Sequence, residues 1–136
     1  MALATFVNVQ EFAMDRLRVL VADDNKTNLF VMKRILDKTA CDYVAATDGL
    51  EAVAAARAHR PNLVLLDISM PNMDGIAAAK IIREDFKNER IVIVAVTAND
   101  SIEQREACHA AGFDRFMAKP IKRQEIVDLV ESLSDT

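Results

Sequence analysis

The chain alternates short apolar runs with longer segments of helical periodicity, five times in succession from Leu17 onward. Continuous runs of Val, Ile and Leu are typical of strands buried on both faces, and strands that alternate with helices are typical of a parallel sheet wrapped by helices. The pattern therefore predicts an α/β fold with a single five-stranded parallel sheet. Its strands are expected at 17–22, 43–46, 63–66, 91–96 and 115–118.

The segments that follow the strands predict five helices, at 26–38, 48–59, 74–86, 101–111 and 122–133. The first and last are the clearest, because their apolar residues recur at helical spacing. They are Leu29, Met32, Ile35 and Leu36 in the first helix, and Ile126, Leu129, Val130 and Leu133 in the last.

Turn and cap residues mark several helix ends. Asp48 with Glu51 predicts a capping box, and Asp48 and Asp100 are each expected to act as helix caps or turn residues. The fourth helix is the weakest, with an expected apolar face of little beyond Ile102, Ala107 and Ala110. Such thin burial suits an element that can shift.

Size and charge limit the classes of function. The chain has 136 residues, 51% of them hydrophobic, which is enough for one domain with a core. Its formal net charge of −4 argues against nucleic-acid binding, and no segment resembles a signal peptide or a membrane span. A soluble cytoplasmic protein is expected. Residues 1–15 stand outside the repeating pattern, as a leader or a linker.

Polar residues follow four of the five strands, at the carboxyl edge where ligands bind in open parallel sheets. Asp23 and Asp24 follow the first strand, Asp67 the third, Thr97 the fourth, and Lys119 with Pro120 the fifth. One aspartate after a strand is about as often a cap or turn residue as a functional one. The joint occurrence of these residues at successive strand ends favours a functional site.

Three carboxylates close together repel one another unless a cation neutralises them. An all-oxygen set of this kind favours magnesium, with manganese as the alternative. Lys119 could neutralise charge on an incoming phosphoryl group. The alternative is that it forms only a surface salt bridge. We therefore expect a divalent-metal site at this edge.

Four segments resemble the motifs of response regulator receiver domains: VLVADDN at 19–25, LVLLDISMPNMDG at 63–75, VAVTAND at 94–100 and FMAKP at 116–120. Their order and spacing match the family over about residues 16–133, so a receiver domain is expected at 16–136. The resemblance implies a flavodoxin-like, doubly wound sheet of strand order 2-1-3-4-5 with five helices.

The resemblance also implies roles for individual residues. Asp67 would be the phosphoacceptor and would take its phosphoryl group from a histidine kinase or a histidine phosphotransfer protein. Asp23, Asp24, Asp67 and the backbone carbonyl of Ser69 would hold Mg²⁺, and Lys119 would offset charge in the transition state. The bond between Lys119 and Pro120 would be cis.

Thr97 and Phe116 would form the conformational switch that the resemblance implies. Thr97 would bind the phosphoryl oxygens, and Phe116 would rotate toward the space that Thr97 vacates. The output would be contact with a downstream protein. Its expected face comprises Ile102, Gln104, Phe116, Lys122 and Arg123.

The expected function is therefore a signalling module whose only enzymatic activities are its own autophosphorylation and autodephosphorylation. One alternative is a magnesium-dependent phosphatase with an aspartyl nucleophile, although Ser69 stands where such enzymes carry a second acid. A scaffold that is never phosphorylated is another. A nucleotide-binding domain is disfavoured, because the chain lacks GxGxxG and GxxxxGK[ST] sequences.

Overall fold

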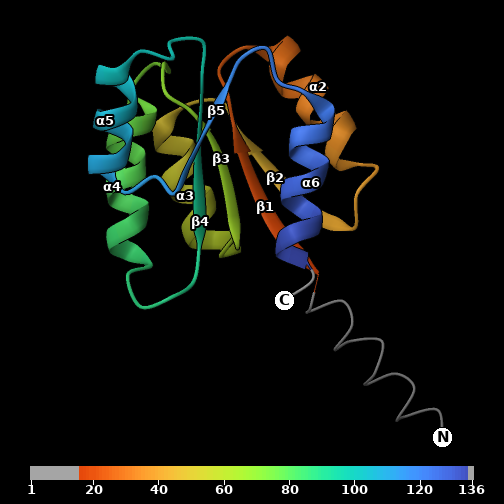
Figure 1. The fold of residues 1–136 in the computed structure, drawn as a ribbon. Coiled ribbons are helices and arrows are strands. Elements are labelled where there is room, and N and C mark those ends of the chain that lie inside the picture. The colour runs from red at the N-terminus through yellow and green to blue at the C-terminus, as the bar shows by residue number, and fades with distance from the viewer. Residues whose placement is uncertain (1–15, 135–136) are drawn as a thin grey trace, which may run out of the picture.

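The computed structural model describes residues 16–134, so the expected leader at 1–15 lies outside the described residues. Five parallel strands form one sheet in the order β2-β1-β3-β4-β5, and the predicted α/β fold is confirmed (Figure 1). The strands are β1 (Leu17–Ala22), β2 (Cys41–Ala46), β3 (Leu63–Asp67), β4 (Val92–Thr97) and β5 (Arg115–Ala118). The helices are α2 (Lys26–Leu36), α3 (Gly49–His59), α4 (Gly75–Asp85), α5 (Ile102–Ala111) and α6 (Arg123–Ser134).

Helices cover both faces of the sheet, α2 and α6 on one and α3, α4 and α5 on the other (Figure 1). Each face has its own core. Leu36, Leu65 and Ile126 are fully buried on the first face, and Leu66 and Ile82 on the second. Full burial of such a side chain contributes roughly 1.5–3 kcal/mol, so the two cores hold the strand ends in fixed positions.

The central strands β1, β3 and β4 are buried almost throughout, as their unbroken apolar sequences predicted. The edge strands β2 and β5 are less buried, and each has exposed and half-buried residues beside its buried ones. Strand β2 begins two residues earlier than predicted, because Cys41 and Asp42 pair with Leu17 and Arg18 of β1. That pairing is not visible in the local sequence of β2.

Side-chain caps start four helices at the carboxyl edge of the sheet. Asn25, Asp48, Asp74 and Ser101 each accept a hydrogen bond from the backbone N–H three residues later. The cap predicted at Asp48 is confirmed, but the Glu51 carboxylate accepts the N–H of Thr47 rather than closing the box at Asp48. Asp100 was expected to be a cap or a turn residue; Ser101 is the cap, and Asp100 lies in the loop before it.

Helix α5 packs through a face that differs from the predicted one. Its buried residues are Cys108 and Ala111, whereas Ile102, Ala107 and Ala110 are exposed. The helix is rotated so that the small residues Cys108 and Ala111 meet the core, which leaves Ile102 with 71% of its surface in solvent. No described helix is both long and apolar enough to cross a membrane.

Candidate functional site

The carboxyl edge of the sheet brings together an aspartate triad and a lysine. Asp67 is the last residue of β3, Asp23 follows β1, and Lys119 follows β5. Lys119 Nζ lies 3.2 Å from Asp23 Oδ2 and 3.3 Å from Asp67 Oδ2. Asp24 is exposed beside them, and one carboxylate oxygen from each aspartate lies within 4.8 Å of the others. Four residues predicted from the sequence therefore meet in space.

Backbone contacts fix Asp23 in the interior. Its N–H donates to the carbonyl of Ala46 at 3.1 Å, and its Oδ1 accepts the N–H of Asn25 at 2.8 Å. Its Oδ2 is buried and accepts no well-aligned hydrogen bond from the described residues, although it forms the ion pair with Lys119. A buried carboxylate oxygen without a hydrogen bond is costly unless another positive ligand satisfies it.

The carboxylates and Lys119 shift one another's proton affinity. Burial, and then the nearby negative charge of Asp23, raise the pKa of Asp67 above its usual range, despite the opposing effect of Lys119. Burial alone would lower the pKa of Lys119, but Asp67 and Asp23 together outweigh it and raise that pKa. The lysine is therefore firmly cationic, and the site still carries excess negative charge.

This donor set fits a divalent cation. Three carboxylates converge, the buried Oδ2 of Asp23 pairs with Lys119 but accepts no well-aligned hydrogen bond, and the single lysine leaves the site net negative. Mg²⁺ prefers oxygen ligands of this kind. Asp23, Asp24 and Asp67 are the residues that could hold such an ion.

Thr97 closes the site on the β4 side. The residue is 4% exposed, and its Oγ1 accepts the N–H of Asn99 at 3.0 Å. Its carbonyl accepts the N–H of Lys119 at 2.8 Å, and the bond between Lys119 and Pro120 is cis. Ser69 is exposed, with its N–H directed at Asp67 Oδ1 at 3.4 Å.

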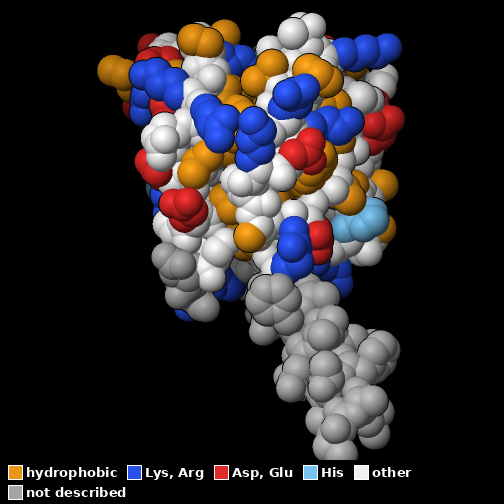
Figure 2. Space-filling view, turned by 90° about the vertical axis from the view of Figure 1, so that its right-hand side faces the viewer, with side chains coloured by type: hydrophobic (Ala, Val, Ile, Leu, Met, Phe, Trp, Pro, Cys, Tyr) orange, Lys and Arg blue, Asp and Glu red, His pale blue; other side chains and the backbone are white. Residues whose placement is uncertain are grey.

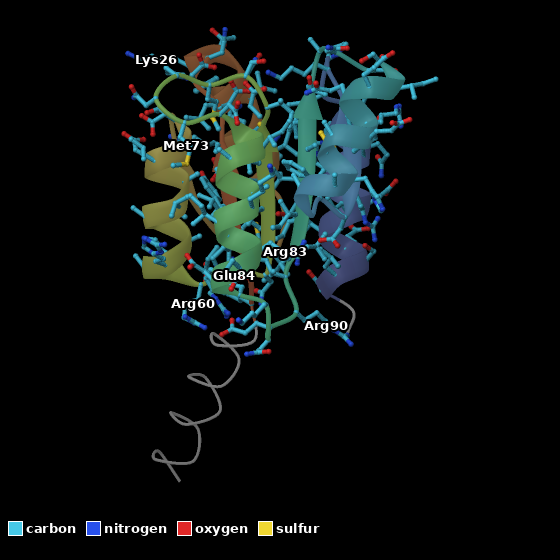
Figure 3. All side chains as sticks on the ribbon, turned by 90° about the vertical axis from the view of Figure 1, so that its left-hand side faces the viewer. Lys26, Arg60, Met73, Arg83, Glu84 and Arg90 are labelled. Atoms are coloured by element: carbon cyan, nitrogen blue, oxygen red, sulfur yellow. The ribbon has the colours of Figure 1, made fainter. Side chains whose placement is uncertain are left out.

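The loop from Ile68 to Asp74 is held by contacts whose roles were not predicted from the sequence. The carbonyl of Met73 accepts the N–H of Gly49 at 2.9 Å, and Asn72 Nδ2 donates to Asp48 at 2.7 Å. Figure 3 shows Met73 at the same end of the molecule as Lys26, with Arg60 and Arg90 at the opposite end.

Gly75 is the second unpredicted feature. A Cβ at this position would lie 2.1 Å from the carbonyl oxygen of Asp67, so only glycine lets α4 start this close to the end of β3. Its N–H donates to the carbonyl of Ile68 at 2.8 Å. The signal was in the sequence, as the glycine that follows Asp74.

The predicted partner-face residues are accessible in part. Ile102, Lys122 and Arg123 are exposed, whereas Gln104 and Phe116 are half-buried. A groove of about 410 Å³ runs between β5 and α6. Its lining includes Phe116, Glu125, Asp128 and Leu129.

An apolar patch on α2 was also not predicted. Phe30 is 58% and Val31 43% exposed, on the helix that begins directly after the aspartate pair. A hollow of about 270 Å³ there is lined by Phe30, Val31, Arg34, Ile35, Lys38 and Arg123. Figure 2 shows basic side chains gathered on the face of the molecule that α2 and α6 form. The sequence did indicate this patch, because Phe30 and Val31 are apolar but do not belong to the set of α2 residues that is buried against the sheet.

Residues 19–131 match the response regulator receiver domain family. Among curated proteins, the chain is 36% identical over 120 residues to hybrid signal transduction histidine kinase L of Dictyostelium discoideum, covering 84% of this chain. It spans only 7% of the length of that relative.

Two examples illustrate the solved structures that share the fold. One is the receiver domain of a sensor histidine kinase from Pseudomonas aeruginosa PAO1, with a magnesium ion coordinated in its active site cleft. The identity is 30% and the TM-score 0.80, covering 89% of this chain and 99% of that one. The other is the receiver domain of Ssk1 from Saccharomyces cerevisiae in complex with the histidine phosphotransfer protein Ypd1. There the identity is 25% and the TM-score 0.82, covering 88% and 90%.

Proposed function

This chain belongs to the response regulator receiver domain family, and on that premise we propose that it accepts a phosphoryl group on Asp67 from a phosphohistidine of a partner protein. The observation that carries the proposal is the buried Asp67 carboxylate, with Lys119 at 3.3 Å and two further carboxylates beside it. A carboxylate nucleophile beside a lysine and a candidate metal site suits phosphoryl transfer, in which positioning and electrostatics do most of the work.

In the proposed step an oxygen of Asp67 attacks phosphorus. The bond between phosphorus and the histidine nitrogen of the donor breaks, and that nitrogen leaves with the bonding pair and gains a proton. The Lys119 ammonium, whose raised pKa keeps it charged, lies where it can neutralise a phosphoryl oxygen. The hydrogen bond from the Ser69 N–H helps to orient the attacking carboxylate.

Asp23, Asp24, Asp67 and the backbone carbonyl of Ser69 would hold Mg²⁺, and Mn²⁺ could occupy the same oxygen ligands. The ion would supply positive charge at the phosphoryl oxygens. The buried Oδ2 of Asp23 supports this assignment, because it accepts no well-aligned hydrogen bond and a metal ion would be a second positive partner beside Lys119.

The proposed switch joins Thr97 to Phe116. The Thr97 hydroxyl accepts a hydrogen bond from its own loop, and rotation toward Asp67 would let it donate to a phosphoryl oxygen instead. Phe116 is half-buried on the neighbouring strand, where it can respond to that movement. Two discrete arrangements biased by one local charge are sufficient for signalling.

Two surfaces serve the proposed partners. The phosphodonor would be a histidine kinase or a histidine phosphotransfer protein, as in the Ypd1 complex of the similar yeast receiver. Exposed Phe30 and Val31, on the helix that follows Asp23 and Asp24, would contact it. The downstream protein would bind the face of Ile102, Gln104, Phe116, Lys122 and Arg123.

A magnesium-dependent phosphatase remains the second candidate, because it would use the same nucleophile and the same metal. The exposed Ser69 in place of a general acid argues against it. Turnover of an exogenous phosphomonoester would favour the phosphatase. A scaffold would bind partners without ever gaining a phosphoryl group.

Intact-mass spectrometry after incubation with Mg²⁺ and acetyl phosphate tests the proposal. The parent should gain about 80 Da, the mass of one phosphoryl group, and should lose this gain when the metal is chelated. Asp67→Asn should gain nothing. The matched control is Asp42→Asn, an exposed aspartate on β2, which should behave as the parent does. An equal gain in Asp67→Asn would refute the assignment.

A further inference from the structure

Arg105 links the ring of Phe116 to the loop that follows Thr97. It lies in the first turn of α5, and its guanidinium carbon is 4.4 Å from the centroid of the Phe116 ring. This distance is the shortest of the three contacts between an arginine and an aromatic ring among the described residues. A cation over a ring face attracts it electrostatically, so Arg105 favours the observed orientation of Phe116.

The Phe116 ring packs against the core on the α4 and α5 side of the sheet but is not fully enclosed by it. The residue is half-buried on the edge strand β5, and hollows border it on two sides. One hollow of about 190 Å³ is lined by residues of α5 and β5, with Arg105 among them, and the other is the groove beside α6. A half-buried ring that borders two hollows has room to change orientation, and the contact with Arg105 favours the orientation observed.

The second partner of Arg105 lies in the loop between Thr97 and α5. Its guanidinium lies 3.6 Å from Asp100 Oδ2, in the short loop between Thr97 and α5. Hydrogen bonds tie that loop together, from the Asn99 N–H to Thr97 Oγ1 and from the Ser101 N–H to Asn99 Oδ1. A movement of Thr97 toward Asp67 would therefore shift this loop, and Asp100 with it. The ion pair of Asp100 with Arg105 would change, and so would the contact of Arg105 with the Phe116 ring.

We propose that Arg105 is a positioning residue that holds Phe116 in its resting orientation and so limits how readily the chain enters the phosphorylated conformation. The proposal rests on the function proposed above and deepens it. Both side chains of the Arg105–Asp100 pair are about half exposed, so their attraction is weak and yields when Thr97 moves. Removing the arginine charge should raise the rate of phosphorylation by acetyl phosphate roughly two- to fivefold.

Arg105→Gln is the test, because it removes the charge and keeps a long, helix-compatible side chain. Arg105→Lys restores a cation near the ring and should return the rate toward that of the parent. The matched control is Arg60→Gln, another arginine over a phenylalanine ring with a carboxylate partner, at the opposite end of the molecule (Figure 3). The rate is followed by intact mass, and thermal unfolding confirms that each variant is folded.

Fluorine NMR of para-fluorophenylalanine, incorporated only at position 116, reports on the ring itself. Phosphorylation of the parent should move its signal. The signal of unphosphorylated Arg105→Gln should already be displaced toward the phosphorylated position, and that of Arg60→Gln should not. Loss of the nearby charge can by itself move a fluorine signal, so the readout that a merely structural role would not give is a displacement toward the phosphorylated position together with faster phosphorylation.

The proposal is overturned if Arg105→Gln matches the parent in rate and in its resting fluorine signal. It is equally overturned if Arg60→Gln produces the same acceleration, because the effect would then be unspecific. If the parent gains no phosphoryl group, the proposed function fails. In that case identical resting fluorine signals in the parent and in Arg105→Gln would still overturn the positioning role of Arg105.

Discussion

Replacing Asp67 with asparagine should stabilise the metal-free protein while abolishing its phosphorylation. Asp67 and Asp23 are both buried, and their nearest ligand oxygens lie within 4.8 Å. At an effective dielectric constant of about 20, two like charges at that distance repel by about 3.5 kcal/mol. At the same dielectric constant, the attraction between Asp67 and Lys119 at 3.3 Å is about 5 kcal/mol. Removing the Asp67 carboxylate from water costs several kcal/mol.

The balance is unfavourable to the ionised carboxylate by about 2 kcal/mol, in agreement with the raised pKa of Asp67. Asparagine keeps an oxygen for the Ser69 N–H and adds an amide donor near Asp23. The midpoint of thermal unfolding in a chelator should therefore rise by about 6 °C. Differential scanning calorimetry of the parent and Asp67→Asn measures this shift, with Asp42→Asn as the control that should not change.

The pH dependence follows from the sign of the pKa shift. A carboxyl whose pKa is raised in the folded state contributes stability below its unfolded pKa, near 3.8, and loses that contribution as the pH rises through the folded pKa. The gain in stability of Asp67→Asn over the parent should therefore be small at acidic pH and largest at neutral pH. A variant that is less stable than the parent at neutral pH in chelator would refute the account of charge crowding.

Three further outcomes are expected. Gly75→Ala should destabilise the fold by about 3 kcal/mol in urea unfolding and abolish phosphorylation, because the added Cβ would lie 2.1 Å from the Asp67 carbonyl oxygen. Arg83→Met should cost about 2 kcal/mol in the same assay without affecting phosphorylation, because the guanidinium donates to the carbonyls of Gly112 and Ile91 and pairs with Asp114. Mg²⁺ at ten times its dissociation constant should stabilise the parent by about 1.4 kcal/mol in calorimetry, and Asp23→Asn should show a much smaller effect.

Much of the candidate site could be predicted from the sequence, because its residues follow strands. A run such as LVLLD predicts its own secondary structure, and parallel strands carry Asp23, Asp67 and Lys119 to the same edge. The five-strand pattern predicted an α/β sheet, and the resemblance supplied the strand order that the structure confirms. Local sequence was therefore sufficient for those site residues whose proximity depends only on the order of the strands that they follow.

The remainder depends on how helices rotate against the sheet. The α5 sequence has apolar residues on more than one side, and only packing against α4 and the core of that face selects Cys108 and Ala111 as its buried face. The contact between Arg105 and Phe116 joins α5 to β5 and therefore depends on that rotation. Such contacts have no local signal, since each residue alone is an ordinary arginine or an ordinary core aromatic.

The central claim is that Asp67 itself carries the phosphoryl group. Borohydride reduction of the phosphorylated protein converts an aspartyl phosphate to homoserine, and peptide mass spectrometry then identifies the modified position. We predict homoserine at position 67 after incubation with Mg²⁺ and acetyl phosphate, and none when the metal is chelated. Homoserine at Asp23 or Asp24, or an unmodified Asp67 in protein that has gained a phosphoryl group, would contradict the account.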